Sequence, residues 1–185
     1  MRVLEFIVSL LDGLAELLGR FASVFAPLML LVTCYIVVTR YFMNTGSVAV
    51  QDLVTYCNAL IFTLGAGYAL KHDAHVRVDI FYNTSSPRTK ALINLAGSLF
   101  MLLPVMVFLL WACWDYVASA WAIREGSPDT GGLPYVYLLK TLILVMGGVL
   151  ILQGVAEALR SLLQLLEGRG HSNLASTTLD EDNRL

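Results

Sequence analysis

Charged residues are scarce in this sequence, and neither sign is in clear excess. Asp, Glu, Lys and Arg make up 14% of the 185 residues, which is about half the share in an ordinary soluble domain. Hydrophobic residues make up 57%, and the formal net charge is -2. The chain therefore has no basic excess with which to neutralise phosphates, which argues against nucleic-acid binding. The composition indicates an integral membrane protein.

Residue patterns that carry catalytic or redox chemistry are also missing. The three cysteines lie far apart inside apolar stretches with no CxxC pair, which favours small apolar contacts over a thiolate metal site. None of the three histidines falls in the middle of a long apolar run, so ligands for a haem held between helices are lacking. No Ser-His-Asp set, phosphate-binding loop or dinucleotide glycine pattern occurs. We therefore expect no cofactor, no metal and no enzymatic activity.

Long apolar runs dominate what is present. A bilayer core of about 30 Å needs about 20 helical residues to cross it, and four segments meet this requirement. The expected spans are 21–39, 52–70, 91–123 and 135–166. The third is long enough that it must tilt, kink at Pro104 or project beyond the membrane. The sequence thus predicts an all-α membrane protein whose four transmembrane helices occupy a domain at 20–166.

The two ends of the chain differ from this domain. Residues 1–19 alternate apolar and acidic positions at helical spacing, which predicts a separate amphipathic helix at the membrane interface. Its acidic face, which includes Asp12 and Glu16, is poorly suited to anionic lipid headgroups and favours contact with protein. Residues 167–185 are polar and poor in bulky apolar side chains, which predicts a disordered tail.

Lys and Arg are distributed unevenly between the two sides of the predicted membrane domain. They concentrate near both ends of the chain and in the interval 71–90, whereas the other two loops hold only Arg40 and Arg124. Short loops rich in Lys and Arg stay in the cytoplasm. We therefore expect both termini in the cytoplasm and a multi-pass protein of a bacterial inner membrane.

Two charges lie within the expected spans, where charges are costly. Asp115 is near the end of the third span and Lys140 is near the start of the fourth. These spans are expected to be antiparallel neighbours, so the two residues should lie at similar depth and approach each other. The pattern fits either a structural ion pair, with Lys140 also able to reach water, or part of an ion or substrate path.

Glycines recur in the second and fourth spans. Small residues let neighbouring helix backbones approach closely in a membrane. The expected helix-packing positions are Gly65, Gly67, Gly147, Gly148 and Gly154.

Several short motifs resemble one family when taken in order. They are Arg40-Tyr41-Phe42-Met43-Asn44, Asp52-Leu53, Leu64-Gly65-Ala66-Gly67-Tyr68-Ala69-Leu70, His75-Val-Arg77-Val-Asp79, Pro87, Trp121-Ala-Ile-Arg-Glu125-Gly-Ser127-Pro128, Gly132-Leu133-Pro134 and Lys140. In this order the chain is similar, over about residues 20–165, to the small membrane subunit of TRAP transporters, the DctQ-like permease component.

The resemblance implies a tripartite, sodium-driven importer. In such a system a periplasmic binding protein captures an organic acid, and a large membrane subunit, paired with the small one as a heterodimer, moves it inward by symport. The small subunit would be a scaffold in the lipid bilayer. His75, Arg77 and Asp79 would order the cytoplasmic loop, and Arg40, Asp52 and Arg124 would form polar contacts at the outer face.

A different class of function fits the same composition. A membrane-anchor subunit of a respiratory or other multi-subunit complex also has few helices and a larger partner. It would normally supply cofactor ligands from within its spans.

Overall fold

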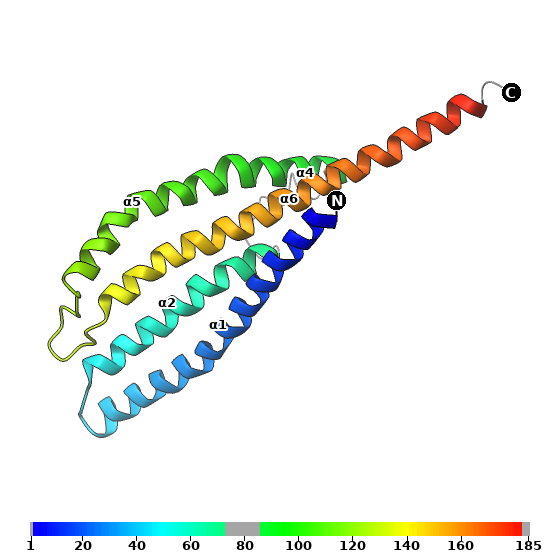
Figure 1. Cartoon of the computed structure of the whole chain (residues 1–185). Helices are drawn as coiled ribbons and strands as arrows, with labels where there is room; N and C mark the ends of the chain where they lie inside the picture. The colour runs from blue at the N-terminus through cyan, green and yellow to red at the C-terminus, as the bar shows by residue number, and fades with distance from the viewer. Residues whose placement is uncertain (1, 73–85, 183–185) are drawn as a thin grey trace.

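The computed structural model describes residues 2–72 and 86–182, and its regular elements in these ranges are helical (Figure 1). The elements are α1 (Arg2–Phe42), α2 (Val48–Lys71), α4 (Pro87–Ala96), the π-helical segment η1 (Gly97–Leu102), α5 (Leu103–Ala122) and α6 (Val136–Asp182). In the same ranges, four helical stretches are long and apolar enough to cross a membrane: Leu4–Phe42, Val48–Lys71, Arg88–Ala122 and Val136–Leu166. The prediction of an all-helical chain with four such helices is confirmed.

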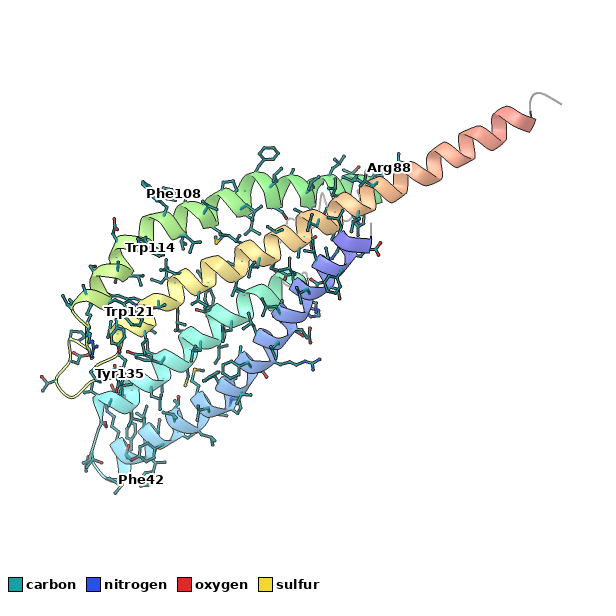
Figure 2. The ribbon with its side chains drawn as sticks, in the orientation of Figure 1. Phe42, Arg88, Phe108, Trp114, Trp121 and Tyr135 are labelled. Atoms are coloured by element: carbon teal, nitrogen blue, oxygen red, sulfur yellow. The ribbon has the colours of Figure 1, made fainter. Side chains whose placement is uncertain are left out.

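The helices lie side by side in a curved layer in the order α1, α2, α6, α5 (Figure 1). α6 packs against α2, α5, α4 and η1, and also contacts α1. Both termini lie at one end of the layer, which we call the terminus side. The connections 43–47 and 123–135 lie at the other end, which we call the loop side. Trp114, Trp121 and Tyr135 are found toward the loop side (Figure 2), as expected for aromatic residues at a membrane interface.

The N-terminal segment is part of the first long helix. A separate interfacial helix at 1–19 was predicted, but residues 2–42 form one continuous helix of 41 residues. Gly19 and Arg20 do not interrupt it. Gly19 lies against α2, where a Cβ would come within 2.5 Å of the Tyr68 ring. The acidic face of the segment contacts α2 and α6 of the same chain, so the predicted protein contact is internal.

The third stretch is irregular just before its proline. Pro104 lacks a backbone N–H, and its ring would clash with the carbonyl four residues earlier, at Phe100. The π-helical segment Gly97–Leu102 contains that carbonyl, and it widens the helix there. Of the three outcomes expected for this overlong span, the structure therefore shows a local distortion associated with Pro104.

The fourth helix is longer than expected. α6 continues through 167–182, beyond the other helices (Figure 1), where a disordered tail was predicted. The polar composition of 167–185 shows that this segment lacks apolar side chains for packing. It does not show that a helix formed upstream can continue into the segment. Extending an existing helix requires no new nucleus, and each added residue gains a backbone hydrogen bond.

The layer has little interior. In the most apolar part of α1 and of the third stretch only 6% of residues are buried, against 39% in α6. The buried hydrophobic residues are mostly small: Ala15, Ala22, Cys57, Ala91, Ala120 and Ala156 among others. Most of the apolar surface is thus available to lipid or to another membrane protein.

Three of the five predicted packing glycines lie at helix contacts. A Cβ on Gly67 would lie 2.5 Å from Val149 Cγ1, so α2 and α6 approach closely there. Gly147 and Gly154 face leucines of α5 and η1, at 2.7 and 2.8 Å from the equivalent Cβ positions. Glycine therefore allows close approach on both sides of α6: α2 supplies it at Gly67, and α6 supplies it toward α5 and η1.

The other two predicted packing glycines have free space beside them. No heavy atom lies within 4 Å of a Cβ built on Gly65 or Gly148. Gly19, which was not predicted, makes a closer approach than either of them. Glycine content alone did not distinguish the residues that face a neighbouring helix from those on an open surface.

We expect Gly67→Ala to destabilise the isolated subunit and Gly65→Ala to leave it unchanged. The new methyl at position 67 would overlap Val149, whose β-branched side chain has little freedom to move. Overpacking of this kind typically costs about 1–3 kcal/mol. Thermal unfolding of the two detergent-purified variants measures the difference, and equal midpoints would contradict the α2–α6 contact.

Candidate functional site

The ion pairs among the described residues lie toward the two ends of the layer. The terminus-side network consists of Asp12 on α1, Asn94 on α4, and Gln153, Glu157 and Arg160 on α6. Asp12 lies about 45 Å along α1 from its loop-side end by helical rise, beyond the thickness of a bilayer core. The network is therefore near the membrane surface on the terminus side.

Arg160 is at the centre of this network. Its Nη2 donates to both carboxylate oxygens of Asp12, at 2.8 and 2.9 Å, and its Nη1 donates to Glu157. Gln153 Nε2 donates to Asp12 at 3.2 Å, and Asn94 Nδ2 donates to Glu157 at 3.2 Å. Because Gln153 and Glu157 are buried, these bonds satisfy groups that water does not reach. The network ties α1 and α4 to α6.

A second group on the same side joins α1 to α2. Lys71 Nζ donates to Glu16 at 2.9 Å, and His72 Nε2 lies 3.3 Å from the same carboxylate. Arg20, one turn along α1, also pairs with Glu16 at 3.3 Å. The sequence signal for both groups was the acidic face of residues 3–18, but it did not identify the basic partners.

The loop-side network consists of Lys140, Glu125 and Tyr116. The partner of Lys140 differs from the predicted one. Lys140 Nζ donates to Glu125 and lies 4.1 Å from the centroid of the Tyr116 ring. Asp115 forms no ion pair with any residue in 2–72 or 86–182. The predicted approach of Asp115 to Lys140 is therefore wrong. Neighbouring helix positions differ by 100°, so Tyr116 is placed over Lys140 while the Asp115 side chain points elsewhere.

Asp52 fixes the long loop after α5. Its Oδ2 accepts a hydrogen bond from the Leu133 backbone N–H at 2.8 Å, which ties the 123–135 connection to α2. α2 begins at Val48 with Ser47 at the N-cap position, so Asp52 lies inside the helix and does not cap it. Trp121 Nε1 also donates to Thr141 at 2.8 Å and ties the end of α5 to α6.

The two arginines grouped with Asp52 in the sequence analysis do not join it. Arg40 lines a cavity of about 640 Å³ beside the 43–47 connection, with Asn44 and Gln51 among the lining residues. Arg124 follows α5 with a positive φ of 47° and is exposed. Neither arginine forms an ion pair within the part of the chain that the structure describes. The predicted residues His75, Arg77 and Asp79 lie outside the described ranges.

A groove follows α6 on one face of the layer. Its walls are α2 and, near the loop side, Tyr116 of α5, and its volume is about 540 Å³. We call it the α2–α6 groove. The residues that line it are Thr55, Asn58, Ala59, Phe62, Thr63, Tyr116, Val136, Leu139, Lys140, Leu142, Ile143 and Met146. Most of this lining is apolar.

The polar side chains described above bind one another and join helices and loops. Over residues 2–72 and 86–182, no three His, Cys, Asp or Glu side chains group so that they could hold a metal ion. The charged side chains of both networks are paired with one another and connect helices. They hold the layer together at its two ends.

We expect Arg160→Ala to destabilise the subunit by roughly 2–4 kcal/mol, because it leaves Asp12 and the buried Glu157 without a counter-charge. Arg20→Ala is the matched control. Its side chain is 77% exposed, and such a pair contributes at most about 1 kcal/mol. The measurement is thermal unfolding in detergent.

A second variant separates the ion pair from a packing effect. Adding Asp12→Ala to Arg160→Ala removes one of the unpaired charges and should recover part of the lost stability. If the double variant were less stable than Arg160→Ala by the full cost of Asp12→Ala alone, the two residues would not be coupled.

Comparison with protein families agrees with the resemblance seen in the motifs. The family model described as "Tripartite ATP-independent periplasmic transporters, DctQ component" matches residues 29–164. The match covers all of α2, α4, η1 and α5, and most of the apolar part of α6. No curated protein and no solved structure gives a significant match.

Proposed function

Because this chain belongs to the DctQ component family of tripartite ATP-independent periplasmic transporters, we propose that it is the scaffold subunit that supports the large transport subunit. The family consists of transporter components and not of enzymes. Because the chain belongs to this family, we reject the alternative that it is a membrane-anchor subunit of a respiratory complex.

The observation that carries the scaffold role is the distribution of the polar groups. A transport path through this chain would need polar groups facing a cavity across the membrane. The charged residues of the two networks instead pair with each other at the two ends of a thin layer. The long apolar surfaces of α1 and α5 are not covered by other described parts of the chain.

The proposed assembly has three components. A periplasmic binding protein delivers an organic acid, and the large membrane subunit moves it into the cytoplasm with sodium. The present chain forms a heterodimer with the large subunit and holds it in position in a bacterial inner membrane. It contributes surface and rigidity, and it does not contribute a transport site.

Reconstitution tests this role. We expect sodium-dependent uptake of an organic acid into liposomes when the chain, the large subunit and the binding protein are all present. The chain alone should move no solute. Full uptake by the large subunit and binding protein without this chain, or uptake by this chain alone, would overturn the proposal.

We further propose that the terminus side faces the cytoplasm. The support is the excess of Lys and Arg near both chain ends and in 71–90, together with the position of both termini on the same side of the layer (Figure 1). In a cysteine-free version, we expect Thr130→Cys to react with an impermeant thiol reagent in intact cells. His75→Cys should react only after permeabilisation, and the reverse pattern would contradict this orientation.

A further inference from the structure

Among the residues that the structure describes, some polar side chains of α2 have no hydrogen-bond partner; the buried Tyr56 hydroxyl is one, and Asn58 is another. Asn58 is exposed in the α2–α6 groove and forms no hydrogen bond with any residue in 2–72 or 86–182. It follows the first residue of α2 by ten positions, or about 15 Å at helical rise. This depth is near the middle of a bilayer core of about 30 Å. An amide at that depth cannot reach water, and it finds no hydrogen-bonding group in lipid tails.

The residues beside Asn58 form a surface suited to a helix. Phe62, one turn further along the groove, is 70% exposed, and Gly65, in the next turn, has no heavy atom within 4 Å of its Cβ position. In a helix, residues 58, 62 and 65 lie on one face. A large apolar side chain, an unpaired amide and an open glycine therefore share the free face of α2. Small residues and interhelical hydrogen bonds are what bring transmembrane helices together.

We propose that the α2–α6 groove is the surface that receives a transmembrane helix of the large subunit, and that this helix presents a hydrogen-bonding side chain to Asn58. The inference rests on the proposed function, because that function supplies the partner. An acyl chain could fill the apolar part of the groove but would leave the amide unpaired. A helix that brings a polar side chain fills the groove and also satisfies Asn58.

Site-specific photocrosslinking in the co-expressed complex tests the contact. A benzophenone amino acid replaces Phe62 in one version and Phe108 in the other. Phe108 is a matched control because it is also an exposed aromatic, 62% against 70%, and it lies on the outer edge of α5 (Figure 2). We expect a covalent adduct with the large subunit, identified by mass spectrometry, from position 62 and not from position 108.

The other outcomes overturn the inference. An adduct of position 62 with a second copy of this chain would make the groove a homodimer surface, and an adduct with lipid only would make it lipid-facing. An adduct with the large subunit from position 108 alone would place the contact on α5 and leave the scaffold role intact. Failure of the unsubstituted chain to co-purify with the large subunit would reject the scaffold role itself.

Asn58→Leu tests the hydrogen bond separately from the shape of the groove. We expect the variant to weaken association with the large subunit about three- to tenfold, the range for one interhelical hydrogen bond in a membrane. The isolated variant should fold normally, because Asn58 has no partner to lose. Thr33→Val on α1 is the control: Thr33 already donates to the Met29 carbonyl at 2.7 Å, so association should not change. Unchanged association of Asn58→Leu would reject the proposed bond.

Discussion

The structure depends on how α6 is held, because the remaining helices all pack on it. In a membrane, burying apolar side chains against one another gains little over leaving them in lipid, so other forces must bring helices together. α6 uses two of them. Glycines allow close van der Waals contact along its length toward α2, η1 and α5. Toward the two ends of the layer, Arg160 and Lys140 of α6 pair with carboxylates from α1 and from the connection after α5.

This division explains the thin shape of the protein. The ion pairs are placed near the membrane surfaces, where water still reaches part of Arg160 and Asp12, whose side chains are 29% and 23% exposed. The middle of the layer has mostly small-residue contacts and few buried side chains. Ion pairs and hydrogen bonds at both ends can make such a layer rigid without a large hydrophobic core. The layer also exposes a wide lateral surface. That property suits a subunit whose work is to support a neighbouring membrane protein.

The sequence predicted the existence of the helices better than the contacts between them. Apolar length alone located the four long helices, because the bilayer sets that length.

The pairing of Lys140 was predicted wrongly. Asp115 and Glu125 both precede it in the sequence, and which of them becomes its partner depends on helix rotation and on the shape of the 123–135 loop. The partner of Asp12 lies 148 positions away, at Arg160. No local pattern distinguished Arg160 from the other basic residues near the ends. The glycines show the same limit, since Gly65 and Gly67 differ only in which face of α2 they occupy.

The polar residues of the long helices can be sorted by whether they have a partner and how far they are from water. Asp12, Glu157, Arg160 and Lys140 are paired, so the chain itself accounts for them. Asp115 has no ion-pair partner among the described residues, but it lies only seven positions from the end of α5, or about 10 Å, so water near the interface can solvate it. Asn58 has no hydrogen-bond partner in 2–72 or 86–182, and it lacks this access to water. A polar side chain in that position costs free energy in the isolated subunit, and a neighbouring protein that bonds to it recovers that free energy. The same residue that weakens the subunit in lipid is thus the one that favours its assembly.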